Sequence, residues 1–250
     1  MTSLPSVLAS LAACGPGLKL ADHLVVIAHG NSAKQLCDSL HRFCWLDAQA
    51  SPEGKKEERL DWRKLEAAAL AVGEGIGTFT IDLDLMFIQN PFGLLQQPEL
   101  RHLDYFVRSE FGNATLSHED GLVNIGFQYF APTSASRELL EIYLRDQSAW
   151  AQAVMQDLLR KRTVEKLQWQ VLDSIQAKSF CHLVPEIARQ MQTNKVVAAV
   201  VKYFLEKDVE WDKVVFYHFP CCDQVDKPNK LCKSLLTNVV LDGWLQSQEL

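Results

Sequence analysis

The chain has 250 residues, 48% of them hydrophobic, which is enough apolar material to bury the core of one large domain. Its formal net charge is −6 and no cluster of lysines or arginines stands out, which argues against a nucleic-acid-binding or anionic-membrane surface. No run reaches about 18 consecutive apolar residues, so no transmembrane segment is predicted.

Apolar strands and helices alternate along the first third of the chain. The predicted order is helix 1–14, strand 23–30, helix 31–43, strand 44–47, polar loop 48–58, helix 59–73 and strand 78–82. Such alternation predicts an α/β fold with a mostly parallel sheet.

The remaining chain continues the same kind of pattern, with more helix. Its predicted elements are strands 104–110 and 125–132, helix 134–160, strand 167–172, helix 186–206, strand 213–219 and helix 227–240. No repeat, low-complexity segment or linker interrupts them. We therefore expect one domain over residues 1–250.

Two aspartates follow the apolar run that begins at Thr78. Asp82 and Asp84 lie at and just beyond the C-terminal end of a buried strand, which is the edge where open α/β sheets bind ligands. Side chains two residues apart on an extended backbone point the same way, and two carboxylates repel unless a cation lies between them or one is protonated. A hard divalent ion resolves this repulsion and can also take diphosphate oxygens. An exposed acidic turn is the alternative, and the apolar flanks disfavour it.

Three segments resemble the nucleotide-diphospho-sugar transferase family of GT-A glycosyltransferases, in the family's order. They are "DLDLMFIQNPF" from Asp82, after a helix carrying basic residues, "NIGFQYFAPTSASRELLEIY" from Asn124, and "VVFYHFPCCDQVDKPNKL" from Val214. The resemblance covers roughly residues 24–244. It implies a GT-A-like (Rossmann-like) fold and transfer of a sugar from a nucleotide-sugar donor to a hydroxyl of a glycan or protein acceptor.

The resemblance also implies roles for single residues. It makes Asp82, Asp84 and His218 ligands of Mn²⁺ or Mg²⁺, which binds the donor diphosphate. Residues expected near the donor sugar or the acceptor are Asn124, Gly126 and Gln152. Residues expected to neutralise phosphate are Arg63, Lys64 and Lys227. Each also has a plainer interpretation: His218 as a strand-end histidine, Asn124 and Gly126 as a turn, and the basic residues as a solvated surface.

The acceptor side departs from the family pattern. On the helix after the Asn124 segment, the family has Asp-Gln and then Asn four residues after the Gln. Here Ala151 takes the aspartate position, Gln152 is kept, and Gln156 takes the asparagine position. Asp146-Gln147, five residues upstream, would face elsewhere on a helix.

Further departures lie near the two ends of the resemblance. Pro220 replaces the asparagine two residues beyond His218, and the glycine between that histidine and Lys227 is missing. The chain also begins at the helix expected after the family's first strand, which normally helps to hold the base and ribose. An impaired, transferase-like binding or partner module, or a fragment of a longer enzyme, is therefore the alternative to an active enzyme.

The seven cysteines are scattered and odd in number, and do not indicate a disulfide framework, although one or two bridges are compatible with an oxidising compartment. A zinc site would be another alternative, built from His218, Cys221 and Cys222 with Cys181 and His182. Adjacent cysteines lack the usual C-x₂₋₄-C spacing, which disfavours zinc. Family members typically work in the Golgi lumen behind a membrane anchor, and with no anchor predicted the location stays open.

Overall fold

The structure, a computed structural model, describes residues 3–14, 17–47, 56–109, 123–145, 147, 149–172, 177–179 and 213–218. The chain divides into two compact units. Unit 1 comprises Met1–Ala21, Leu83–Gly93 and Asp173–Leu250, and unit 2 comprises Asp22–Asp82 and Leu94–Leu172. Two short 3-10 helices, η1 (Leu20–His23) and η2 (Pro91–Gln96), lie where the chain passes between the units. The single domain expected from the sequence stays a prediction.

Unit 2 begins with a βαβ segment. It consists of β1 (Val26–His29), α2 (Asn31–Leu40) and β2 (Cys44–Asp47). The two strands are parallel and pair from Val26↔Cys44 to His29↔Asp47, so His29 and Asp47 lie side by side at the C-terminal ends. A disulfide joins Cys37 of α2 to Cys44 of β2.

A four-stranded sheet forms the centre of unit 2. Its strands, in spatial order, are β3 (Thr78–Ile81), β6 (Val123–Phe130), β5 (Tyr105–Ser109) and β7 (Trp169–Val171). Strand β6 is antiparallel to both neighbours, whereas β5 and β7 are parallel. The α/β class expected from the sequence is confirmed. Because β6 runs against β3 and β5, the parallel arrangement holds only in part.

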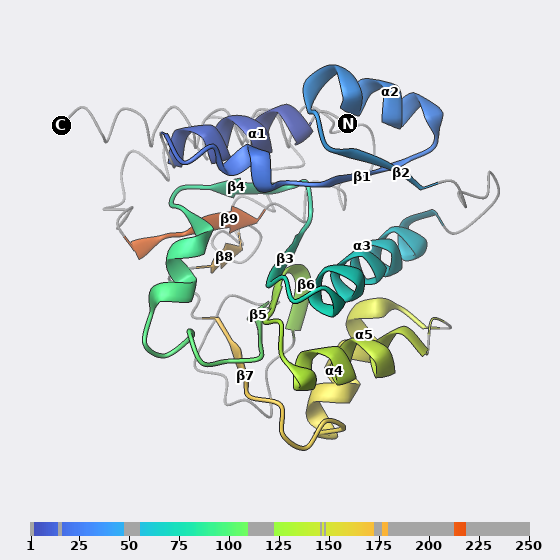
Figure 1. Cartoon of the computed structure of the whole chain (residues 1–250), viewed down its shortest axis with the longest axis vertical. Helices are drawn as coiled ribbons and strands as arrows, with labels where there is room; N and C mark the ends of the chain where they lie inside the picture. The colour runs from blue at the N-terminus through green and yellow to red at the C-terminus, as the bar shows by residue number, and fades with distance from the viewer. Residues whose placement is uncertain are drawn as a thin grey trace, which may run out of the picture. The chain divides into compact units, whose positions relative to one another are not determined.

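Three helices pack against this sheet in unit 2: α3 (Lys56–Gly73), α4 (Ser134–Arg145) and α5 (Ala151–Arg160) (Figure 1). Helix α3 buries Trp62, Leu65, Ala68 and Val72, a spacing of three and four residues that gives one apolar stripe. This stripe joins one hydrophobic core with side chains of β5, β6, α4 and α5. The single helix predicted over residues 134–160 is two helices, because α4 ends at Arg145 and α5 begins at Ala151.

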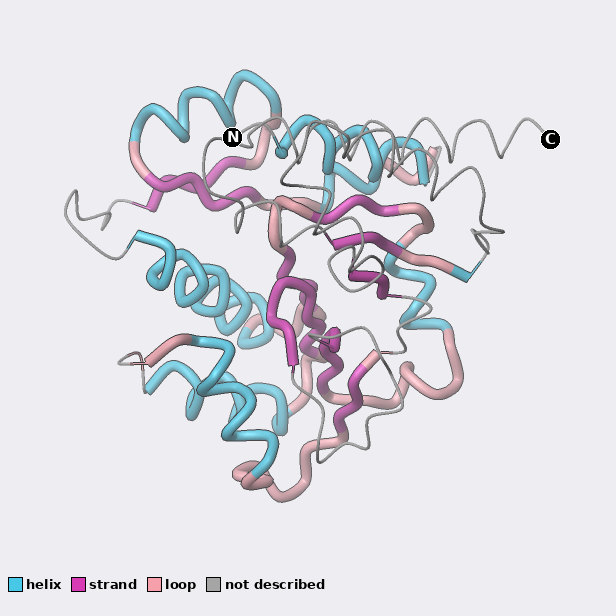
Figure 2. Tube along the Cα trace, turned by 180° about the vertical axis from the view of Figure 1, so that it is seen from behind, coloured by secondary structure: helices cyan, strands magenta, loops and turns pink. Residues whose placement is uncertain are grey.

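Unit 1 contains a smaller sheet and one described helix. Its elements are α1 (Ser3–Cys14), β4 (Leu85–Phe87), β8 (Ala177–Ser179) and β9 (Phe216–His218). Strand β9 lies between β4, which is antiparallel to it, and β8, which is parallel. Helix α1 runs alongside β4 (Figure 2), where the backbone N–H of Phe87 donates to Ser10 Oγ at 3.2 Å. Within the described part of the chain, none of the helices combines the length and the hydropathy that a membrane-spanning segment needs.

Candidate metal and nucleotide-sugar site

Strand pairing in unit 1 brings Asp84 to His218. Leu85 of β4 is the register partner of His218 in β9, and Asp84 immediately precedes Leu85. Oδ1 of Asp84 lies 3.1 Å from Nε2 of His218. Only 2% of the imidazole and 13% of the Asp84 side chain are exposed. Both side chains are therefore largely shielded from water.

The distance between these two groups fits neighbouring ligands of one ion. In an octahedral site with bonds of about 2.1 Å, adjacent ligand atoms are about 3 Å apart. The same distance suits a hydrogen bond from a protonated Nε2 to the carboxylate. That proton would have to leave before an ion could bind, because metal ligands must be deprotonated.

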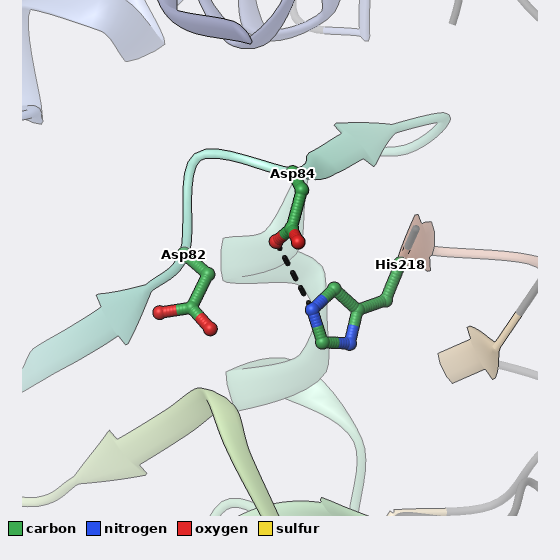
Figure 3. A group of neighbouring side chains, drawn as sticks. All are labelled: Asp82, Asp84 and His218. Carbon is green, nitrogen blue, oxygen red and sulfur yellow. Dashed lines mark hydrogen bonds and ion pairs between the residues drawn. The ribbon is translucent and has the colours of Figure 1, made fainter. Parts of the chain in front are cut away.

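Asp82 directly follows β3 in unit 2 and precedes Asp84 by two positions. Its backbone N–H donates to the carbonyl of Gly126 at 2.8 Å. One ligand atom from each of Asp82, Asp84 and His218 lies within 4.8 Å of the other two (Figure 3). Two carboxylates and an imidazole are a donor set that suits Mn²⁺ or Mg²⁺, so the residues fit the ion that the sequence implies.

Strand β6 contains a bulge, and backbone carbonyls of this bulge accept hydrogen bonds from Asp82 and Lys64 in unit 2. The register with β5 moves from Val107↔Gln128 directly to Arg108↔Asn124, so residues 125–127 of β6 have no register partner in β5. The carbonyl of Ile125 instead accepts from Lys64 Nζ at 3.2 Å and from Gln128 Nε2 at 3.1 Å. Bulges commonly redirect groups beside functional sites.

Lys64 of α3 contacts Asp82 directly. Its Nζ donates to Oδ1 of Asp82 at 2.6 Å and lies 3.0 Å from Oδ1 of Asp61, one helical turn earlier. Burial alone would lower the pKa of the Lys64 amine, but the charges of Asp82 and Asp61 outweigh burial and raise this pKa above its ordinary value. The amine is therefore a cation that lies between two carboxylates.

Arg63, which precedes Lys64 in the sequence, forms ion pairs with other acidic residues. Its Nε lies 3.5 Å from Oδ1 of Asp47, and its guanidinium also pairs with Glu66. Nδ1 of His29 lies 3.3 Å from Oδ2 of the same Asp47. Arg63 thus reaches the C-terminal end of β2, where Asp47 also contacts His29 of β1, whereas Lys64 reaches the end of β3.

Asn124 and Gly126 shape the start of β6. Oδ1 of Asn124 accepts from the backbone N–H of Gly126 at 3.0 Å, and the Gly126 carbonyl accepts from Asp82. The Asn124 side chain thereby helps to fix the backbone that holds Asp82. Asn124 is buried.

Helix α5 turns two glutamines toward β6. Oε1 of Gln152 accepts from the N–H of Ile125 at 3.4 Å, and Oε1 of Gln156 accepts from the N–H of Val123 at 2.7 Å. Their spacing of four residues puts them on one helix face. Ala151 begins α5 and is fully buried in the hydrophobic core, where its carbonyl accepts from the Tyr143 hydroxyl at 2.7 Å.

Several residues considered from the sequence lie outside the described residues. They are Lys227, Pro220, Asp146, Cys181, His182, Cys221 and Cys222, together with the predicted helices 186–206 and 227–240. The zinc alternative is therefore not tested. Two features were missed in the sequence: Asp61 as a partner of Lys64, which its spacing of three residues could have indicated, and the Cys37–Cys44 disulfide.

Comparison with known proteins identifies the family. The model of the nucleotide-diphospho-sugar transferase family matches residues 19–231, most of the chain. The chain belongs to this family of glycosyltransferases, as the three sequence segments indicated, and the GT-A-like fold expected from them agrees with that membership. A comparison with curated protein sequences finds no match.

Two solved structures resemble the chain distantly. One, a glycosyltransferase involved in the glycosylation of the major capsid of PBCV-1, is 12% identical over 86% of this chain and 98% of its own, with a TM-score of 0.44. The other, apo mouse xyloside xylosyltransferase 1, is 14% identical over 90% of this chain and 93% of its own, with a TM-score of 0.45. Neither likeness bears on the substrate of this chain.

Proposed function

We propose that this protein is a metal-dependent glycosyltransferase. It binds a nucleotide-sugar donor through Mn²⁺ or Mg²⁺ held by Asp82, Asp84 and His218, and it moves the sugar to a hydroxyl of a glycan or protein acceptor. Family membership supports the transferase activity. The observation that carries the metal dependence is the 3.1 Å approach of the Asp84 carboxylate to the His218 imidazole.

The geometry of this pair favours an ion site over an incidental contact. Asp84 directly precedes β4 and His218 ends β9, and these two strands of one sheet are each buried along their whole length. Carboxylates are seldom buried without a partner. A divalent cation would neutralise Asp84 and also Asp82, which lies two positions earlier in the chain.

The proposed reaction replaces the bond between the donor sugar and its diphosphate by a bond to the acceptor. An acceptor hydroxyl attacks the anomeric carbon, the bond from that carbon to the diphosphate oxygen breaks, and the hydroxyl proton leaves with a base or with water. When bound, the ion would neutralise the charge that develops on the departing nucleoside diphosphate. The protein's own residues then hold the reacting groups in place.

Other predicted site residues belong to this proposal. Asn124 and Gly126 fix the backbone at the start of β6, next to which the donor sugar would lie. Gln152 braces the same strand through the N–H of Ile125. Arg63 and Lys227 would neutralise phosphate charge, and Lys227 carries this role from the family resemblance alone.

A donor screen tests the proposed activity. Release of nucleoside diphosphate from UDP- and GDP-sugars should occur with Mn²⁺ and stop with EDTA. Asp84→Ala should lower the rate by about 10²-fold or more, as loss of a positioned electrostatic group does. Asp157→Ala is the matched control, since Asp157 is an exposed acid paired with Lys161 on α5. Turnover that is equal in Mn²⁺ and EDTA would contradict the proposal.

One observation favours a second candidate, a module that binds donor without efficient transfer. Ala151, at the position of the family's aspartate, lies in the hydrophobic core and cannot carry charge to a substrate. Nucleotide binding that depends on Mn²⁺, with no release from any donor and no transfer to any acceptor tested, would favour this module over the enzyme.

We also place the protein in an oxidising compartment, such as the Golgi lumen where family members typically work. The Cys37–Cys44 disulfide supports this location, because such bridges persist outside the reducing cytosol. Peptide mapping of protein isolated from its native cells with thiols blocked tests it: a bridged peptide pair agrees, and two alkylated cysteines would contradict the location.

A further inference from the structure

The Lys64 amine has an acceptor for every hydrogen it can donate. A protonated amine has three N–H donors, and Lys64 Nζ meets Oδ1 of Asp82 at 2.6 Å, Oδ1 of Asp61 at 3.0 Å and the Ile125 carbonyl at 3.2 Å. Only 12% of its side chain is exposed. A phosphate oxygen could bind this amine only by displacing one of these three acceptors.

These acceptors come from three separate elements of unit 2. Asp61 lies one turn before Lys64 on α3, Asp82 follows β3, and Ile125 lies in the bulge of β6. The amine therefore ties the carboxylate of Asp82 to a helix and to a strand. Its contact uses Oδ1 of Asp82, and a carboxylate has a second oxygen that can serve a cation.

We propose that Lys64 is a positioning residue that acts through Asp82 and does not bind the donor diphosphate. This inference rests on the proposed function. It differs from the role implied by the family resemblance, in which Lys64 would neutralise phosphate directly. Lys64 fixes Oδ1 of Asp82, and the orientation of the whole carboxylate toward the ion follows from that contact.

Charge and geometry have opposite effects on metal binding here. Removing Lys64 deletes a positive charge beside the ion, which alone would strengthen binding, and frees the Asp82 carboxylate to rotate, which weakens it. The double variant Lys64→Met/Asp61→Asn removes one charge of each sign and so leaves the local net charge unchanged. A change in the metal affinity of this double variant therefore measures the lost orientation of the Asp82 carboxylate and not a change in charge.

The experiment measures two affinities by calorimetry: Mn²⁺ alone, and UDP in the presence of EDTA. For the double variant we expect the Mn²⁺ Kd to rise by about 10–100-fold, as when a group that orients a metal ligand is lost, and the metal-free UDP affinity to stay unchanged. An unchanged Mn²⁺ Kd would overturn the proposal. So would a loss of metal-free UDP affinity, which would make Lys64 a phosphate ligand.

The matched control is Lys34→Met/Asp38→Asn. This pair is a lysine and an aspartate of one helix, α2 of the same unit, with Nζ of Lys34 2.6 Å from Oδ2 of Asp38, and both affinities should stay at the wild-type value. A control that weakens Mn²⁺ binding as much as the double variant would overturn the proposal, because the loss would then not be specific to Lys64.

Lys64→Arg keeps the charge and tests the same point if the double variant does not fold. The planar guanidinium cannot reproduce three tetrahedrally placed donors but binds phosphate well. A weaker Mn²⁺ affinity with unchanged metal-free UDP affinity supports positioning, and wild-type Mn²⁺ affinity overturns it. If the wild-type protein itself fails to bind Mn²⁺, the proposed function fails and this inference with it; if wild type binds and Lys64→Arg matches it, only this inference fails.

Discussion

Oδ1 of Asp84 lies 3.1 Å from Nε2 of His218, although 134 positions separate them in the sequence. The short β4–β9 ladder makes this contact, since it pairs Leu85 with His218 and leaves Asp84 at its edge. The position of the imidazole beside the carboxylate therefore depends on strand packing in unit 1, and the stability of those strands can be tested separately from their chemistry.

Phe87→Ala should destabilise unit 1 and loosen this ladder. The Phe87 side chain is 1% exposed, and its ring centroid lies 6.0 Å from that of Phe216 in β9. A buried Phe→Ala change typically costs about 3–5 kcal/mol, and here we also expect weaker Mn²⁺ binding under conditions where the variant is still folded. Chemical unfolding and calorimetry measure the two effects. Phe92→Ala, at a half-exposed site in the same segment, is the control, and an equal loss in both variants would argue against the ladder.

The sequence predicted the strand before Asp82, because "TFTI" is apolar and ends at two acids. It did not predict β4, since Leu85–Phe87 is a three-residue stretch within a longer apolar run and periodicity cannot resolve it. The match of β4 to β9 depends on chain packing over a long separation. The family pattern alone pointed to His218, and no local signal in the sequence could have done so.

Ala151→Asp should destabilise the protein. A carboxylate at this position would enter the core among side chains such as Tyr143 and Met155, and an unpaired buried charge costs about 3 kcal/mol or more. Ala153→Asp is a matched control, because Ala153 is exposed in the same first helical turn and an acid there is neutral or slightly favourable. Chemical unfolding of both variants measures the difference; equal stability would place residue 151 in a polar environment.

The break between α4 and α5 was also not predicted from the sequence. Residues 134–160 carry a nearly continuous helical pattern, yet the structure has separate helices that end at Arg145 and begin at Ala151. The second helix lies where Gln152 accepts from the backbone N–H of Ile125, in the β6 bulge, and Gln156 accepts from that of Val123, at the start of β6. The spacing of four residues between the two glutamines indicates that they share a helix face. Nothing in the sequence shows which strand that face contacts.

Reduction of the Cys37–Cys44 disulfide should lower the free energy of unfolding of unit 2. The bridge closes a short loop between α2 and β2, and loop-closure entropy for so few residues corresponds to roughly 2 kcal/mol. Chemical unfolding with and without reductant measures this difference. In the variant Cys37→Ser/Cys44→Ser the reductant should have no effect. A wild-type protein that is equally stable in both conditions would show that the bridge is not formed.

Titration of UDP or GDP into the wild-type protein, with Mn²⁺ and again with EDTA, tests the metal-bridged donor site most directly. We predict tighter binding with Mn²⁺, because the ion would join the diphosphate to Asp82, Asp84 and His218. Asp84→Asn should abolish the difference, while Asp157→Asn, at an exposed surface acid, should preserve it. Equal affinity of the wild-type protein for the nucleotide in Mn²⁺ and in EDTA would contradict the account.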